Sequence, residues 1–175
     1  FNYAWQSDWA NVDGSEAHAH HGLAMMPDGN ILTGHAELPR CLVLDTDGNV
    51  LKEFDVPAGG THGLCCSVED GKTVVWIADI AEAQVVKCSL EGELLACLTK
   101  ADFPLGEADP FCPTAVSVDP ATGEIWVADG YGSHTVHGFT PELKHKLQLD
   151  GAKGRGAFNE PHWVMVDTRK DVSRI

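Results

Sequence analysis

Three histidines recur at one place in a repeated pattern, each directly before a short apolar run. They are His21 in HHGLAMM, His62 in THGLCCS and His162 in PHWVMVD, and Thr114 stands at the same place in CPTAVSV. Three neutral imidazoles suit zinc or a similar divalent ion and leave one coordination position open for water or substrate. In the alternative interpretation, each histidine caps its strand through a hydrogen bond to a neighbouring loop.

The repeat that carries these histidines is typical of four short antiparallel strands. Each apolar run leads into a turn rich in Asp, Pro and Gly, namely PDGN, EDGK and DPATGE. A second apolar run follows, ending in NILTG, VVWIAD or EIWVAD, and two further runs complete the unit. A four-stranded repeat of roughly 40 to 50 residues indicates a propeller blade, whose first strand lines the central channel. Equivalent positions on the first strands should therefore face one axis and bring the imidazoles together.

The spacing of the repeats predicts an all-β fold, a partial propeller. We expect blades at residues 17–59, 60–108 and 109–155, and the first strand of a fourth blade within residues 156–175. Because propellers typically need about four or more blades to close, the remaining blades are expected from a longer chain or a partner. His134, His137 and His145 fall on outer strands or turns, where we expect surface residues.

Composition and charge exclude several classes of protein. The chain is 43% apolar and 22% charged, which favours a folded protein with a core. No apolar run approaches the roughly 18 residues of a membrane span. The formal charge of −14 argues against a nucleic acid partner, because the phosphates would repel the protein.

The six cysteines contain no CxxC pair, so neither a zinc ribbon nor a thioredoxin motif is supported. Adjacent Cys65 and Cys66 must point to opposite faces of their strand. Most of the cysteines are expected to fill blade cores as small apolar residues. Cys112, in a loop before a strand, is the main candidate for a disulfide.

The segments WVADGYGSHTVHGF and GxGRGAFNEPHWVMVD resemble NHL-repeat propellers and, among them, the peptidyl-α-hydroxyglycine α-amidating lyases. The resemblance runs from about Gly60 to Asp167. It implies a six-bladed propeller in which His62 and His162 bind a catalytic Zn²⁺ with a third histidine from the last blade. It also implies that Tyr131 of the DGY turn is the candidate general base. A Ca²⁺ ion deeper in the channel, held partly by backbone carbonyls, would include the carbonyl of Leu64.

Three features depart from the family pattern. The family carries an Arg after the second strand of its first blade, where Ala36 follows His35 here. The family's DGYC turn ends in Gly132 here, so Cys112 lacks the disulfide partner that the resemblance implies. The last blade with the third ligand is absent, and His21 is the candidate to replace or join that ligand. Metal binding therefore transfers better than the particular substrate.

The resemblance implies a zinc-dependent lyase that cleaves the C–N bond of an α-hydroxyglycine-type amide, giving an amide and glyoxylate. The substrate would be a peptide or a small molecule, and the setting secreted or periplasmic. One alternative is a non-catalytic NHL-repeat module that binds a peptide or protein. Another is a metal-dependent lactone or ester hydrolase, a class that usually holds calcium with carboxylate and Asn ligands.

Overall fold

The computed structural model describes residues 3–6, 9, 10, 12, 22–169, 174 and 175 of the chain. Three four-stranded antiparallel sheets follow one another along the sequence, as the repeats predict. Blade 1 contains β1 (Leu23–Met25), β2 (Ile31–Gly34), β3 (Arg40–Leu44) and β4 (Val50–Asp55). Blade 2 contains β5 (Thr61–Glu69), β6 (Lys72–Asp79), β7 (Gln84–Ser89) and β8 (Leu94–Thr99). Blade 3 contains β9 (Ala115–Val118), β10 (Ile125–Asp129), β11 (Thr135–Phe139) and β12 (His145–Leu149).

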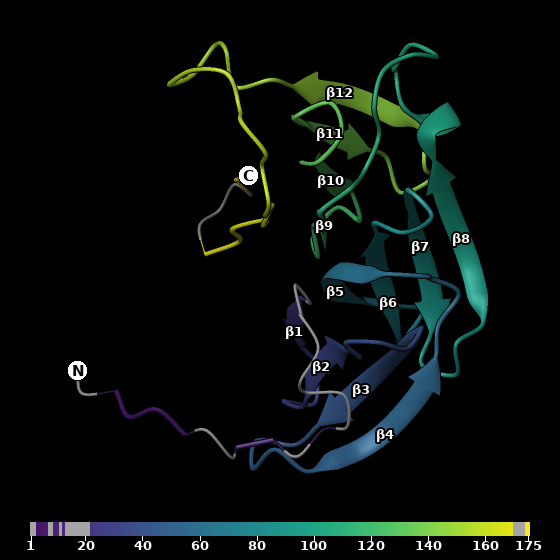
Figure 1. Cartoon of the computed structure of the whole chain (residues 1–175), viewed down its shortest axis with the longest axis vertical. Coiled ribbons are helices and arrows are strands. Elements are labelled where there is room, and N and C mark those ends of the chain that lie inside the picture. Colours follow the sequence, from purple (N-terminus) through teal and green to yellow (C-terminus); the bar gives the residue numbers. More distant parts are fainter. Residues whose placement is uncertain (1–2, 7–8, 11, 13–21, 170–173) are drawn as a thin grey trace.

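The blades form an arc in which β1, β5 and β9 are the inner strands and β4, β8 and β12 form the outer rim (Figure 1). Tight turns join neighbouring strands. In the turn between β3 and β4, Gly48 has a φ of 86°, which glycine adopts without steric cost. The Asp45 carboxylate accepts the backbone N–H groups of Asp47 and Asn49 in the same turn. The Asp and Gly residues of the sequence therefore set the hairpins that define each blade.

The core lies between the blades, and the sheet of blade 2 buries one face against blade 1 and the other against blade 3. Along β6, Val75 and Ile77 pack against blade 1, whereas Val74 and Trp76 pack against blade 3. This alternation follows from the two-residue period of a strand. Adjacent Cys66 and Cys65 obey it as predicted and contact the first and second of these interfaces, respectively.

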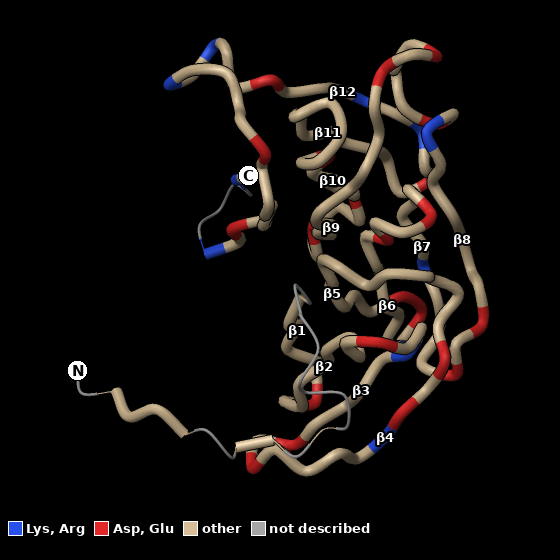
Figure 2. Tube along the Cα trace, viewed as in Figure 1, with Lys and Arg blue, Asp and Glu red and all other residues tan. Residues whose placement is uncertain are grey.

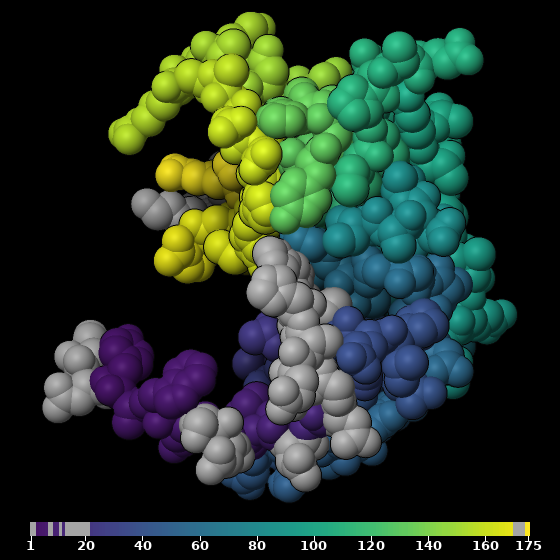
Figure 3. All heavy atoms as spheres, viewed as in Figure 1, coloured from purple at the N-terminus to yellow at the C-terminus, as the bar shows by residue number. Residues whose placement is uncertain are grey.

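The segment after blade 3 lies along β9 but forms no strand over residues 161–166. The Val166 N–H donates to Ser117 Oγ at 3.3 Å, and Val164 is buried beside Ala115 and Trp126. Figure 3 shows this segment, in yellow, against the green surface of blade 3. A strand forms only where its backbone pairs with that of a neighbouring segment. Among the described residues of this segment, only Asp167 has such a partner, through its bridge to Arg174.

Acidic residues, red in Figure 2, occur along the whole arc, and the sequence has 26 Asp and Glu residues against 12 Lys and Arg. The only helical element of the described residues is the 3₁₀ turn η1 (Lys100–Asp102). The described part of the chain thus has no helix of the length and apolarity that a membrane crossing requires.

Candidate functional site

The inner strands start next to one another around the axis. The Gly22 N–H donates to the carbonyl of His62. A Cβ on Gly63 would lie only 2.5 Å from the carbonyl oxygen of Thr114, so a side chain there would push blades 2 and 3 apart. Thr114 Oγ1 donates in turn to the carbonyl of Pro161 at 2.8 Å. Equivalent positions of successive repeats therefore stand side by side.

The hydrogen bonds of His62 and His162 determine which ring nitrogen carries the proton. His62 is 6% exposed, and its Nδ1 lies 2.6 Å from the carbonyl oxygen of Thr114. His162 is exposed, and its Nδ1 lies 2.8 Å from the carbonyl oxygen of Glu160. Because a carbonyl can only accept, both Nδ1 atoms are protonated and both Nε2 atoms carry the lone pair. Histidines that bind metals are oriented in this way by their second nitrogen.

Tyr131 contacts both imidazoles, and the three rings form a triangle. The ring centroids of His62 and His162 are 5.9 Å apart, and the Tyr131 ring lies 5.5 Å from the first and 4.7 Å from the second. The hydroxyl of Tyr131 donates to His162 Nε2 at 2.7 Å. Tyr131 is 38% exposed, so its hydroxyl group can also meet a ligand. The structure thus brings together three residues that the sequence analysis selected from separate repeats.

The loop that carries Tyr131 is held by Asp129, a residue that the sequence analysis did not select. Asp129 is fully buried, and its carboxylate accepts the N–H of Cys112 at 2.7 Å and the N–H of Ser133 at 2.7 Å. Asp79 plays the same part at the end of β6, where it accepts the N–H groups of Gly59 and Gly60. The signal was present in the sequence, because both second strands end in Ala-Asp.

Cys112, the main candidate for a disulfide, is a free thiol, as are the other five cysteines of the chain. The reason lies at Gly132, where an ideal Cβ would be 2.6 Å from the backbone nitrogen of Cys112. The place that faces Cys112 thus carries no side chain with which a bond could form. Burial raises the pKa of the Cys112 thiol, and the charges of Asp129 and Asp79 raise it further.

Two candidate metal ligands remain, His21 and the backbone carbonyl of Leu64. His21 lies outside the described residues. The side chain of Leu64 is buried between blades 1 and 2. His35 accepts the N–H groups of Glu37 and Leu38 at Nδ1 and so caps the turn after β2. Within the ranges that the structure describes, no group of three or more His, Cys, Asp and Glu residues is arranged to hold a metal ion.

His137 corrects the prediction of a surface residue, because it is fully buried in β11. Its Nε2 lies 2.8 Å from Thr135 Oγ1, and its Nδ1 lies 3.2 Å from His145 Nε2. Phe103, in the connection between blades 2 and 3, covers its ring edge-on. Burial lowers the pKa of His137 to about 4, and the neighbouring charge of His145 contributes to this shift. This ring is a neutral member of the core.

Comparisons with known proteins agree with the blades and with the motifs of the site. The family model described as "NHL repeat" matches residues 112–139. The chain is 33% identical over 173 residues to peptidylglycine alpha-amidating monooxygenase of Rattus norvegicus, a match that covers 92% of this chain and 16% of that protein. Peptidyl-glycine alpha-amidating monooxygenase B of Xenopus laevis is 42% identical over 108 residues, which cover 58% of this chain and 12% of that protein. The chain thus spans a small part of the length of these relatives.

Solved structures share the fold. Virginiamycin B lyase from Staphylococcus aureus superimposes with a TM-score of 0.58 at 14% identity, over 80% of this chain and 43% of that chain. A chain of the nidogen/laminin complex gives a TM-score of 0.54 at 16% identity, over 83% of this chain and 50% of that chain. The chain is therefore an NHL-repeat protein with the blades of a β-propeller, homologous over most of its length to a segment of peptidylglycine alpha-amidating monooxygenase.

Proposed function

We propose that this chain supplies part of the active site of a metal-dependent lyase, which cleaves the C–N bond of an α-hydroxyglycine-type amide to give an amide and glyoxylate. The observation that carries the proposal is the convergence of His62, Tyr131 and His162, with the Nε2 lone pairs of both histidines set by backbone carbonyls. The resemblance of the THGL, DGY and PHWV motifs to α-amidating lyases supplies the reaction, and the homology to an alpha-amidating monooxygenase supports it.

The donor set fits zinc, since two neutral imidazoles with oriented Nε2 atoms are ligands that this ion prefers. The third ligand in the proposal is His21 or a histidine of another blade. When bound, the ion would polarise the hydroxyl oxygen of the substrate. The backbone carbonyl of Leu64 remains the candidate ligand for a structural calcium ion deeper in the channel.

The geometry gives Tyr131 a role that depends on His162. The Nε2 atom of His162 has one lone pair, so it can accept the Tyr131 hydroxyl or coordinate an ion, but not both. If that nitrogen held an ion, the Tyr131 hydroxyl would lose its acceptor on His162 and its oxygen would be able to meet the substrate. As the base it would act in its deprotonated form: the phenolate oxygen would take the proton of the substrate hydroxyl as the C–O bond becomes a carbonyl, and it would pass that proton on to the leaving nitrogen. The C–N bond breaks with its electron pair on nitrogen, which takes up a proton to give the amide.

Zinc binding tests the proposal most directly, because two of the proposed ligands lie in the described part of the chain. We expect His62→Ala and His162→Ala each to weaken zinc binding by roughly a hundredfold in a competition titration with a chromogenic chelator. His145→Ala is the matched control, since it removes a histidine from the outer strand β12 and should leave the affinity unchanged. Glyoxylate release from an N-acyl-α-hydroxyglycine is the second readout. Unchanged zinc affinity in both site variants would favour a non-catalytic binding module instead.

We also infer a secreted or periplasmic setting from the resemblance. The six free thiols weigh against it, because cysteines in oxidising compartments are usually paired. A thiol titration of the protein recovered from the extracellular or periplasmic fraction tests this point. Recovery only from the cytosol would contradict it.

A further inference from the structure

A second recess lies at the opposite end of the inner strands from the histidine site. Its volume is about 660 Å³, and it is bordered by the ends of β1, β5 and β9, with side chains of β6 and β7 as one wall. His62 is the second residue of β5, and Glu69 at the recess is the last. Seven residues of strand span about 23 Å at roughly 3.3 Å per residue. The recess is therefore separate from the site described above.

The indole of Trp76 gives the recess an unused hydrogen-bond donor. Trp76 lines the recess and is 2% exposed, and its Nε1–H has no hydrogen-bond partner among the described residues. An indole N–H can only donate, and buried donors without an acceptor are rare because they are unfavourable. The ring is also held in place, since the Lys87 ammonium lies 5.5 Å from its centre. The wall of the recess therefore contains a buried donor that lacks an acceptor.

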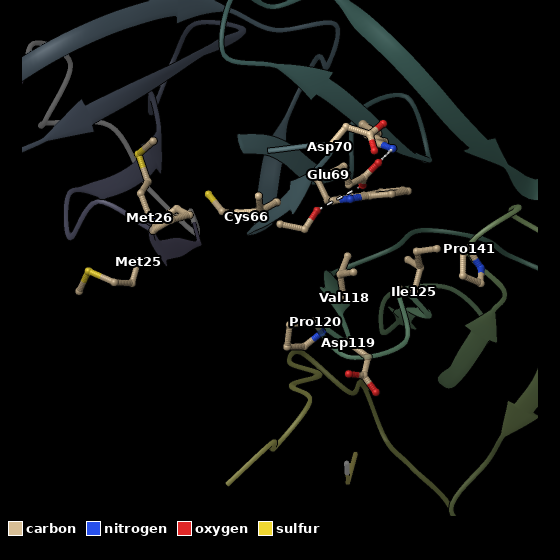
Figure 4. A pocket seen from close by; sticks show the side chains of 16 residues that line it. Met25, Met26, Cys66, Glu69, Asp70, Val118, Asp119, Pro120, Ile125 and Pro141 are labelled. Atoms are coloured by element: carbon tan, nitrogen blue, oxygen red, sulfur yellow. Dashed lines mark hydrogen bonds and ion pairs between the residues drawn. The ribbon is translucent and has the colours of Figure 1, made fainter. Parts of the chain in front are cut away.

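The charged groups of the recess favour a cation. Three carboxylates line it, those of Glu69, Asp70 and Asp119, against the single ammonium of Lys87. That ammonium is already paired with Glu69, so it is not available to a negatively charged ligand. Asp70 stands exposed at the tip of the hairpin between β5 and β6, next to Glu69 in Figure 4.

The remaining lining is apolar and adaptable. Met25 and Met26 lie on one side of the recess, and Pro120 and Ile125 lie on another (Figure 4). Methionine side chains adjust to irregular ligands, and Met25 is 67% exposed and so has room to move. The recess thus combines a donor, an excess of negative charge and flexible apolar contacts.

We propose that this recess binds a short peptide segment with a basic side chain. A backbone carbonyl of the peptide accepts the Trp76 N–H, the basic group pairs with Asp70, and the aliphatic parts contact Met25 and Pro120. A peptide offers a carbonyl at every residue beside a long cationic side chain, which is the combination that the recess requires. The site is independent of the lyase proposal, because it uses none of the same residues.

The test uses two peptides with blocked termini that differ in one side chain, acetyl-Ala-Lys-Leu-amide and acetyl-Ala-Glu-Leu-amide. The readout is the indole ¹H–¹⁵N signal of Trp76, identified by its loss in Trp76→Phe. We expect the Lys peptide to shift this signal saturably and the Glu peptide to leave it in place. By isothermal titration, Trp76→Phe should weaken the Lys peptide by roughly five- to tenfold, the range for loss of one hydrogen bond.

Asp70→Asn should also weaken the Lys peptide several-fold and reduce the effect of salt on binding. Asn tolerates the positive φ of 48° at this position, so the variant keeps the turn. Glu107→Gln, which neutralises one exposed acid that does not line the recess, is the matched control and should bind as the parent does. His62→Ala should also bind the peptide normally, whatever its effect on zinc.

Three results would overturn the proposal. The first is no saturable shift of the Trp76 signal up to about 10 mM of the Lys peptide. The second is equal binding of the two peptides. The third is unchanged affinity in Asp70→Asn, which decides the matter even if Trp76→Phe fails to fold.

Discussion

Two histidine pairs in this protein show how neighbours decide the role of an imidazole. At the start of the inner strands, backbone carbonyls accept the Nδ1–H of His62 and of His162, so their Nε2 lone pairs belong to the candidate site. On β11 and β12, the Nδ1 atom of His137 faces another histidine and not a backbone carbonyl. His137 is buried, and its Nδ1 lies 3.2 Å from His145 Nε2.

The outer pair is the end of a hydrogen-bonded chain that begins at Asp129. The Asp129 carboxylate accepts the Ser133 hydroxyl at 2.6 Å, Ser133 Oγ lies 2.5 Å from Thr135 Oγ1, and Thr135 Oγ1 lies 2.8 Å from His137 Nε2. Since the carboxylate only accepts, each donor in turn must point toward it. His137 therefore carries its proton on Nε2 and accepts from His145 at Nδ1. The same residue type thus presents an Nε2 lone pair at the candidate site in one region and packs into the core, as His137, in the other.

Asp129 connects the two regions, so its removal should have the largest effect. In Asp129→Ala, the half-buried N–H groups of Cys112 and Ser133 lose their acceptor, and the hydrogen-bonded chain to His137 loses the carboxylate at its end. We expect the free energy of unfolding to fall by about 3 to 5 kcal/mol, measured by urea denaturation. Asp45→Ala removes a similar turn carboxylate in a more exposed place and should cost about 1 kcal/mol. If both variants lost the same free energy of unfolding, the hydrogen-bonded chain from Asp129 to His137 would contribute nothing to stability.

The burial of His137 should make stability depend on pH. The pKa of His137 is lowered to about 4, whereas a histidine in the unfolded chain titrates near pH 6.5. Between these values the unfolded state binds more protons, so the free energy of unfolding falls as the pH drops from about 6.5 to 4, by about 2 kcal/mol. His137→Phe keeps an aromatic ring beside Phe103 and should flatten this part of the profile in denaturation at stepped pH. An unaltered slope would mean that other groups cause the acid sensitivity.

Removing the hydrogen bond between Tyr131 and His162 should have a smaller effect, which is a gain in zinc affinity and not a loss of stability. Tyr131→Phe removes the hydroxyl that occupies the lone pair of His162, so we expect zinc affinity to rise roughly three- to tenfold, the equivalent of about 1 kcal/mol. Glyoxylate release should nevertheless fall, because the proposed base is lost. Competition titration and product assay on the same preparation separate the two roles. A loss of zinc affinity would instead make Tyr131 a ligand or a support of the ligands.

The last test determines which ring nitrogen carries the proton in each histidine pair. Nitrogen-15 NMR of the protein above pH 7 should find the proton of His162 on Nδ1 and that of His137 on Nε2, through the one-bond coupling of each ring nitrogen to hydrogen. The same tautomer in both residues would contradict the assignment of donors described above.

Much of the fold follows from the sequence because hairpins are local. Asp and Gly at the turns, together with alternating apolar residues, define each blade without reference to distant contacts. The repeat also predicted that His62 and His162 would share one end of the arc, and Tyr131 was selected through the family resemblance. Equivalent positions of repeated units are placed by the stacking of the units, so a repeat in the sequence becomes proximity in space.

Other features depend on contacts between segments that no local pattern reveals. His137 lies in an outer strand, yet Phe103 and Phe111, from the connection between blades 2 and 3, help to bury that region. The lack of a side chain at Gly132 left Cys112 as a free thiol, and residues 161–166 formed no strand because a ladder requires a partner backbone. The recess at Trp76 likewise exists only because three blades meet there. The sequence alone determined the repeating unit and its special positions, whereas the packing of the units decided which polar groups are buried, because burial depends on all the segments that surround a residue.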